Sequence, residues 1–411
     1  MDAKQMRVCF GAFIGMTVSA PALASSVPLL LEPTAREFGW GRATISLAYM
    51  VAAPLAAISY LFVGRLLDRF GARRILIPGF ILCGLSYMLL TQLNGSVTQL
   101  LILKTISSLC GTLPTGVAFG NIISRYFTGR RGTVLGLCLG AGGGLGMALL
   151  PLLGAFLLES WGWRSTYLGI GLVAVLVGLP AALLLPGNAP DRSPAQQDAR
   201  VGQAVAPEPG LGMDSRSALR HLAFLLLLAT TFLTCMVING IGAHMAAIMT
   251  DHGMTHALAA TALSIYAMMM MAGQFGIGIL LDRTNTPRIA IPVFTVVLAG
   301  VALLHLSSGP VGLFLGAALI GAGAGSEYGI LPYFITRFFG VRSFGFLYGG
   351  LYAIAALGTG LGPYLMGLSF DLSGRYGIAL VAFEITILLV ILIVSRFPAY
   401  GYDVTGSRTK A

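Results

Sequence analysis

The stretch Gly64-Arg-Leu-Leu-Asp68-Arg69-Phe-Gly71-Ala-Arg73-Arg74 lies between two long apolar runs, and the related stretch Gly278-Ile-Leu-Leu-Asp282-Arg283-Thr-Asn-Thr-Pro-Arg288 lies between two others. A second pair of segments repeats at nearly the same separation: 123–127 reads Ile-Ser-Arg-Tyr-Phe and 335–339 reads Ile-Thr-Arg-Phe-Phe. Two repeats at nearly one separation are improbable by chance, so the chain consists of two homologous halves in tandem. Duplicated sets of membrane helices are typical of secondary transporters, in which the binding site lies between the repeats.

The composition indicates a membrane protein. Hydrophobic residues make up 56% of the chain and charged residues 10%, against about 45–50% and about 25% in soluble domains. Apolar runs recur that are long enough to cross about 30 Å of hydrocarbon as helices. We expect twelve such spans, at 8–31, 43–66, 75–93, 99–126, 132–157, 165–185, 221–249, 257–281, 289–307, 311–338, 345–369 and 377–396.

The net charge of +10 is explained by membrane topology rather than by a nucleic-acid partner. If the N-terminus is cytoplasmic, most Lys and Arg residues fall in cytoplasmic segments. The opposite face then carries only Arg36, Arg42, Arg164 and Arg375. This bias follows the positive-inside rule. It predicts a multi-pass protein of a bacterial-type cytoplasmic (inner) membrane with both termini in the cytoplasm.

The expected fold is an all-α polytopic bundle of twelve transmembrane helices. We expect an N-terminal six-helix bundle (1–186), a cytoplasmic linker (187–220), a C-terminal six-helix bundle (221–396) and a cytoplasmic tail (397–411). The linker is rich in Pro, Gly and polar residues, as flexible linkers are. No nucleotide-binding loop, metal-ligand cluster or nucleophile constellation is visible, so we expect no enzyme, no cofactor and no metal.

With these residues in view, the chain resembles the major facilitator superfamily. The resemblance rests on the six-plus-six helix plan, the central linker and the pattern Gly-x-x-x-Asp-Arg-x-Gly-x-Arg-Arg between the second and third spans. The segments 38–46, 125–132, 162–167, 325–328 and 337–340 also resemble the monocarboxylate porter group, which includes oxalate/formate exchangers. The resemblance implies two six-helix bundles related by a pseudo-two-fold axis, alternating access and a monomer.

Charged residues of the two loop motifs are candidates for a conformational latch. An aspartate beside a helix N-terminus can accept hydrogen bonds that favour an anion there, and nearby arginines can pair with acidic groups or lipid phosphates. Such contacts would form in one conformation and break in another. The alternative is that the arginines only fix topology. The candidate residues are Asp68, Arg69, Arg73, Asp282 and Arg283.

Three ionisable residues inside the spans are candidates for coupling and binding. Charges near the bilayer centre are costly, so they usually face a cavity or a partner. Glu327 lies near the middle of the tenth span and His244 in the outer part of the seventh, and we predict that both couple transport to protons. Lys104 is a candidate contact for an anionic substrate. Structural roles are the alternatives: helix packing for Glu327, a satisfied interfacial side chain for His244, and snorkelling of Lys104.

Uncharged polar residues near the expected midplane complete the candidate substrate site, because hydroxyl and amide groups can bind a carboxylate or a sugar oxygen. Each of them could equally hold neighbouring helices together. One departure from the monocarboxylate group affects the substrate: Gln274 stands where those carriers often have Arg, and the eleventh span has no lysine. The candidate substrate contacts are Ser19, Lys104, Thr115, Asn239, Gln274, Tyr328 and Tyr352.

The sequence favours a secondary transporter of a small organic acid or related metabolite that works by alternating access and is coupled to protons. Its partners are then the substrate, protons and the lipid bilayer. The alternative is a proton-antiporting exporter of amphipathic or cationic compounds. Against the exporter, the fifth span lacks a Gly-Pro step after the glycine run 140–144. A channel or a membrane sensor fits the two-repeat plan less well.

Overall fold

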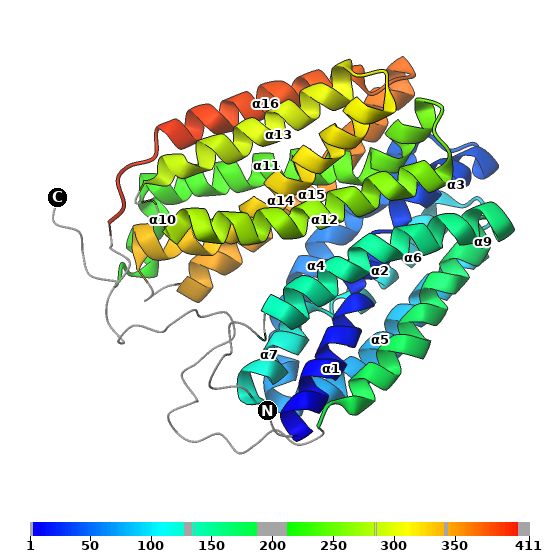
Figure 1. Cartoon of the computed structure of the whole chain (residues 1–411), viewed down its shortest axis with the longest axis horizontal. Coiled ribbons are helices and arrows are strands. Elements are labelled where there is room, and N and C mark those ends of the chain that lie inside the picture. Colours follow the sequence, from blue (N-terminus) through cyan, green and yellow to red (C-terminus); the bar gives the residue numbers. More distant parts are fainter. Residues whose placement is uncertain are drawn as a thin grey trace.

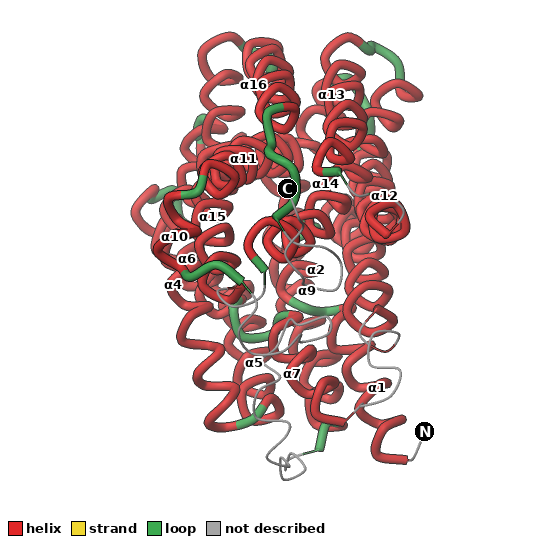
Figure 2. The backbone as a smooth tube through the Cα atoms, turned by 90° about the vertical axis from the view of Figure 1, so that its left-hand side faces the viewer, coloured by secondary structure: helices red, strands yellow, loops and turns green. Residues whose placement is uncertain are grey.

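The structure is a computed structural model that describes residues 3–126, 134, 136–186, 212–282, 284, 286–340 and 344–401. The first half contains α1 (Ala3–Thr17), α2 (Ala20–Ala24), η1 (Val27–Leu30), α3 (Leu31–Phe38), α4 (Arg42–Phe70), α5 (Ala72–Leu89), η2 (Leu90–Gln92), α6 (Val97–Gly111), α7 (Gly116–Tyr126), the π-helical segment η3 (Gly136–Gly142) and α9 (Gly143–Leu184). The second half contains α10 (Ser215–Arg220), α11 (Leu222–Asp251), α12 (His256–Asp282), η5 (Pro287–Ile289), α13 (Ala290–Leu306), α14 (Pro310–Phe339), α15 (Phe344–Ser373) and α16 (Gly377–Ser395). Short loops join most of these helices (Figure 2).

Membrane-spanning helices account for most of the described chain. Eleven of its helical stretches are long and apolar enough to cross a membrane. The stretch Leu137–Leu184 contains two crossings, because the backbone at Gly162 leaves the helical conformation with φ 80° and ψ 175°. A positive φ of this kind suits glycine, which has no Cβ. The twelve expected spans are therefore accounted for.

Two crossings of the first half are broken, although the sequence led us to expect continuous helices at 8–31 and 99–126. The first crossing changes from α1 to α2 at Val18 and Ser19, and the fourth changes from α6 to α7 between Thr112 and Thr115. The two breaks meet, since the Ala20 backbone N–H donates to the Pro114 carbonyl at 3.0 Å. Proline causes such breaks because it has no N–H and disfavours helical geometry in the preceding residue. The corresponding crossings of the second half, α11 and α14, are continuous.

The helices form two groups, α1–α9 and α11–α16 (Figure 1). The groups meet around α3 and diverge toward the opposite end, where the N-terminus, α10 and the last described residues lie (Figure 1). We call the end at α3 the far end, and the opposite end the termini end. Between the groups, α4 packs on α15 and α9 packs on α12. Glycines permit this approach: Gly144 faces Met271, and Gly360 faces Met50.

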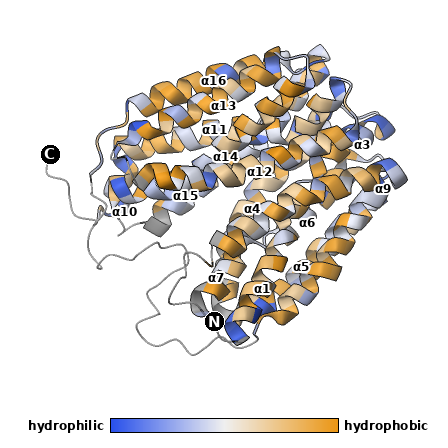
Figure 3. Cartoon of the chain, in the orientation of Figure 1, coloured by the Kyte–Doolittle hydropathy of each residue, from blue (hydrophilic) through white to orange (hydrophobic). Residues whose placement is uncertain are grey.

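The helix surfaces are largely apolar, and hydrophilic residues concentrate near the helix ends (Figure 3). Large side chains such as Leu176, Leu306, Ile378 and Ile385 are between 61% and 76% exposed. So many exposed aliphatic side chains would be unfavourable in water, but they suit contact with lipid.

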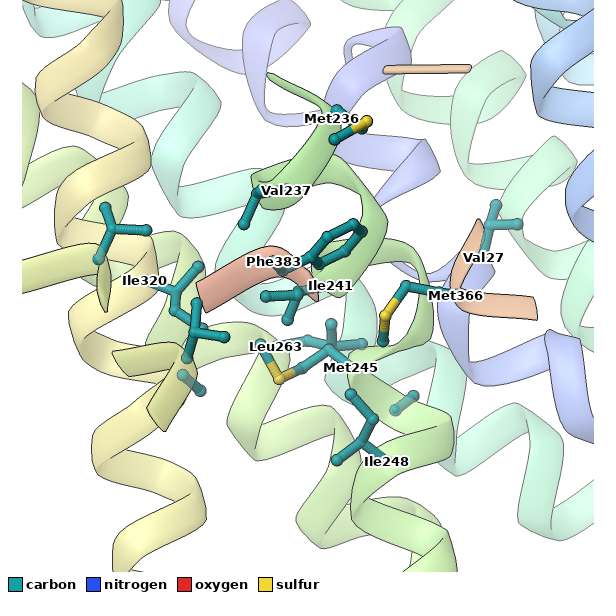
Figure 4. Packing of buried hydrophobic residues seen from close by; sticks show 14 of the residues in the cluster. Val27, Met236, Val237, Ile241, Met245, Ile248, Leu263, Ile320, Met366 and Phe383 are labelled. Carbon is teal, nitrogen blue, oxygen red and sulfur yellow. The ribbon is translucent and has the colours of Figure 1, made fainter. Parts of the chain in front are cut away.

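Inside the second half, apolar side chains from several helices interlock (Figure 4). Ile241 and Met245 of α11 lie near Leu263 of α12 and Phe383 of α16 (Figure 4), and all are buried. Gly240 provides the space for Phe383, because a Cβ at Gly240 would lie 2.9 Å from that ring. This close packing fixes α11, which carries several of the candidate site residues.

Candidate functional site

Glu327 on α14 is the centre of a polar cluster inside the second half. Its side chain is buried, with 6% of the residue exposed. Its Oε1 accepts hydrogen bonds from the Thr234 hydroxyl and, at 3.7 Å, from the Cys235 thiol, both on α11. We call Thr234, Cys235 and Glu327 the Glu327 cluster. It joins two helices of one half.

A glycine run positions Glu327. A Cβ at Gly325 would collide with the Met270 carbonyl oxygen, and one at Gly321 would collide with that of Tyr266. The backbones of α14 and α12 can therefore approach closely only because these positions lack side chains. This contact holds the middle of α14 in place and directs Glu327 toward α11.

The surroundings of Glu327 are apolar and neutral among the described residues. Within the described residues, no cation lies within ion-pair distance of its carboxylate. A narrow apolar pocket borders it, with Leu227, Phe294, Phe334 and Val394 among its lining residues. A buried polar group needs hydrogen-bond partners, and those of Glu327 among the described residues are the neutral donors Thr234 and Cys235.

The other predicted polar residues of the second half take several positions. The Asn239 side-chain amide donates to the Cys235 carbonyl at 2.9 Å, one turn from the Glu327 cluster. Gln274 is exposed on α12. Tyr352 on α15 is half exposed, and its hydroxyl accepts from that of Tyr348 at 3.3 Å. The Tyr328 side chain lies outside the described residues.

In the first half, Ser19 and Thr115 lie at the two helix breaks. Both are buried, and the Thr115 hydroxyl donates to the Thr112 carbonyl at 3.3 Å. The Ser19 hydroxyl has no hydrogen-bond partner among the described atoms. The structure thus brings the two breaks together through the hydrogen bond between Ala20 and Pro114, although they are far apart in sequence.

Lys104 contacts aromatic side chains of its own half. Its Nζ donates to the Tyr167 hydroxyl at 3.1 Å and lies 5.5 Å from the centre of the Tyr49 ring. These cation–π and hydrogen-bond contacts stabilise a lysine inside the bundle. The described contacts do not connect Lys104 with the Glu327 cluster.

His244 lies between the two halves, where it contacts residues of both. It is fully buried, its Nδ1 lies 2.9 Å from the Tyr376 hydroxyl, and its Nε2 lies 3.0 Å from both the Ser46 hydroxyl and the Pro363 carbonyl. Ser46 belongs to the first half, while the other three residues belong to the second. His244 therefore contributes to closure of the far end.

Sequence reasoning missed the strongest polar contacts between the halves. The Arg42 guanidinium binds Asp251 through two hydrogen bonds of 2.6 and 2.8 Å and also donates to the Tyr376 hydroxyl. The backbone N–H groups of Arg42 and Ala43 donate to the Asp371 carboxylate at 2.8 and 2.9 Å. The sequence shows charged residues at the ends of three spans, but it does not indicate which of these residues pair. We call the following residues the far-end cluster: Arg42, Ser46, His244, Asp251, Asp371 and Tyr376.

The comparisons identify the family. The family model described as Major Facilitator Superfamily matches residues 8–363. The chain belongs to this superfamily. The fold predicted from the sequence, twelve transmembrane helices in two six-helix bundles, is therefore confirmed.

Several relatives of the superfamily are similar over most of their length. An uncharacterized MFS-type transporter, YhjX, of Escherichia coli is 23% identical over 74% of this chain and 73% of its own. Human monocarboxylate transporter 2 is 24% identical over 84% of this chain and 74% of its own. Multidrug resistance protein MdtL of Klebsiella pneumoniae is 24% identical over 73% of each chain.

Solved superfamily structures share the fold. A bacterial homolog of the human lysosomal transporter Spinster, in an inward-facing and unoccupied conformation, superposes with a TM-score of 0.68 and 17% identity, over 96% of this chain and 95% of its own. The nucleoside transporter NupG, crystallised as a point mutant, gives a TM-score of 0.73 and 13% identity, over 95% of this chain and 98% of its own. At these identities the likeness concerns the fold alone.

The predicted superfamily latch lies mainly outside the described residues. This is true of Arg283 and of the side chains of Asp68, Arg69 and Asp282. Arg73 is described in the first turn of α5 and is half buried. The latch remains a prediction.

Proposed function

We propose that this superfamily transporter carries a small organic acid across a bacterial-type cytoplasmic membrane together with protons. The observation that carries the proposal is Glu327, a buried membrane carboxylate held by neutral donors of a neighbouring helix. Such a group can bind a proton on one side of the membrane and release it on the other as its surroundings change. The likeness to monocarboxylate transporters supports a carboxylate as substrate.

We further propose that both termini are cytoplasmic, so the closed far end faces outward. The conformation is then inward-facing, because the halves join at the far end and diverge toward the termini end (Figure 1). Residues 1–186 and 221–396 would move as the two bundles of a monomer, with 187–220 as linker and 397–411 as tail. Rocking of the bundles would expose the site alternately.

The proposed substrate contacts come from both bundles. The contact of Gly144 on α9 with Met271 on α12 and the breaks at Ser19 and Thr115 support a site between the bundles. His244 would link a second protonation event to closure of the far end, since it bridges the two bundles. The set is Ser19, Lys104, Thr115, Asn239, Gln274, Tyr328 and Tyr352.

A second function also has support, because MdtL and monocarboxylate transporter 2 are each 24% identical to this chain over their matched lengths. In a proton-antiporting exporter of amphipathic or cationic compounds, Glu327 would be the counter-charge of the cargo. Met271 and the exposed Met268 on α12 would supply an adaptable apolar surface.

The test is uptake of radiolabelled pyruvate, benzoate and tetraphenylphosphonium into proteoliposomes under an imposed pH gradient. We expect carboxylate accumulation in the wild type, about tenfold for one pH unit and one coupled proton. Glu327→Gln should lose accumulation but retain carboxylate exchange, because Gln fills the same space and cannot release a proton. Glu384→Gln is the matched control, since Glu384 is a membrane carboxylate that pairs with His305 at 3.0 Å. Accumulation that persists in Glu327→Gln would refute the proton role, and transport of the cation alone would establish the exporter.

A further inference from the structure

The Arg42 guanidinium pairs with a carboxylate that belongs to the other half of the molecule. Arg42 is the first residue of α4, and Asp251 is the last residue of α11. The Arg42 side chain is 8% exposed, whereas that of Asp251 is 31% exposed at the rim. Asp251 is therefore the more solvent-accessible member of the pair.

The surroundings of Arg42 are arranged to hold one carboxylate in a defined orientation. Both terminal nitrogens of the guanidinium bind Asp251, which is the bidentate geometry that recognises planar carboxylates best. The Phe370 ring stacks on the guanidinium, with its centre 3.6 Å from Cζ. Asp371 binds the backbone of Arg42 and leaves both terminal nitrogens to Asp251 and the Tyr376 hydroxyl.

Alternating access requires these contacts to separate. Asp251, Phe370 and Tyr376 all move with the second half, whereas Arg42 stays with α4 of the first half. Opening the far end therefore leaves an arginine at the mouth without its carboxylate. A cation in a narrow opening raises the local concentration of anions.

We propose that Arg42 is the entry site for the carboxylate group of the substrate when the far end is open, and that Asp251 takes the same position when the far end closes. This rests on the proposed organic-acid function. Closure then displaces the substrate carboxylate from Arg42 toward the middle of the membrane. The site gives Arg42 a second role beyond closure of the far end.

The experiment separates binding from closure by removing the ion pair in two ways. Asp251→Asn breaks the pair and keeps Arg42, whereas Asp251→Asn/Arg42→Gln breaks the pair and removes the cation. Both variants carry Ser46→Cys as a reporter, because Ser46 is fully buried between the halves and can react with a maleimide only when the far end opens. Equal labelling rates show that the two variants are folded and equally open.

Binding of pyruvate and benzoate to the purified full chain is measured by calorimetry. We expect the double variant to bind about tenfold more weakly than Asp251→Asn, a loss expected for one charge-assisted contact. Asp251→Asn/Arg36→Gln is the matched control, because Arg36 is an exposed arginine near the same end and pairs with Glu32 at 2.6 Å. This control should bind like Asp251→Asn.

Two outcomes would overturn the inference. Equal binding by Asp251→Asn and the double variant would show that Arg42 serves closure only, and an equal loss with Arg36→Gln would reduce the effect to net charge. In both cases wild-type binding leaves the proposed organic-acid function intact. Absence of carboxylate binding in every form would remove both proposals.

Discussion

The far-end cluster and the Glu327 cluster are both buried and polar, but different helices hold them. The far-end cluster joins the two halves: Arg42 and Ser46 belong to one half, and Asp251 and His244 to the other. Glu327 and its donors Thr234 and Cys235 all belong to the second half. Contacts between halves must break whenever the far end opens, whereas contacts within a half can persist throughout transport. The first cluster is therefore expected to control conformation, in addition to the proposed entry role of Arg42, and the second to control proton binding.

The largest expected effect concerns the glycine run that positions Glu327. Gly325→Ala places a Cβ against the Met270 backbone, where neither helix can yield easily. We expect about 3 kcal/mol of destabilisation from overpacking, seen as a lower melting temperature in detergent and a loss of transport. Gly349→Ala is the control, because a Cβ there meets nothing within 4 Å. Equal melting temperatures of the two variants would contradict the role of the glycine run.

Arg42→Gln tests the far-end cluster. It leaves the partly buried Asp251 without its cation. The closed conformation should therefore lose about 2 kcal/mol of stability relative to the open one, a value between those for buried and exposed ion pairs. Labelling of a Ser46→Cys reporter should then rise by about thirtyfold. Glu327→Gln should leave this labelling unchanged. An equal rise in both variants would remove the distinction between the two clusters.

A smaller effect is expected from His244→Phe. The aromatic contact with Tyr376, at 5.3 Å between ring centres, can be kept, but the hydrogen bonds to Ser46 and Tyr376 are lost. We expect the closed far end to lose about 1 kcal/mol of stability. The change is measured from the distance distribution between spin labels on α4 and α11. If proton-driven accumulation also fails while closure is normal, His244 couples protons directly instead of through closure.

The smallest effect is expected from Lys104→Met. Because the Lys104 ammonium makes one hydrogen bond, to Tyr167, among the described residues and has three N–H donors, we expect about threefold weaker binding of pyruvate. Far-end labelling should stay at the wild-type rate, since Tyr49 and Tyr167 both lie in the first half. Unchanged affinity would assign Lys104 to helix packing.

The sequence predicted the spans well because hydropathy is a local property. The twelve predicted apolar runs correspond to eleven helical stretches, one of which contains two crossings, and the break at Gly162 falls between two predicted spans. The breaks at Ser19 and near Pro114 were missed. Proline is tolerated inside many membrane helices, as Pro54 in α4 and Pro151 in α9 show, so its presence alone does not predict a break.

The candidate site was predicted less completely. Glu327 stood out because a carboxylate in an apolar run is rare, and its burial agrees with that expectation. His244 also stood out, but its place between the halves could not be inferred, because its partners come from distant segments. Arg42 was interpreted only as a topological charge and as part of a resemblance.

The sequence by itself determined the membrane fold, the duplication and the presence of a lone carboxylate in the tenth span, because composition, periodicity and repetition are properties of the chain. Only the tertiary structure decided that Arg42 meets Asp251 and that His244 meets Ser46. The members of each pair lie in different halves, and their pairing depends on which ends of the two bundles are together. A contact that exists in one conformation and breaks in another leaves no local pattern in the sequence.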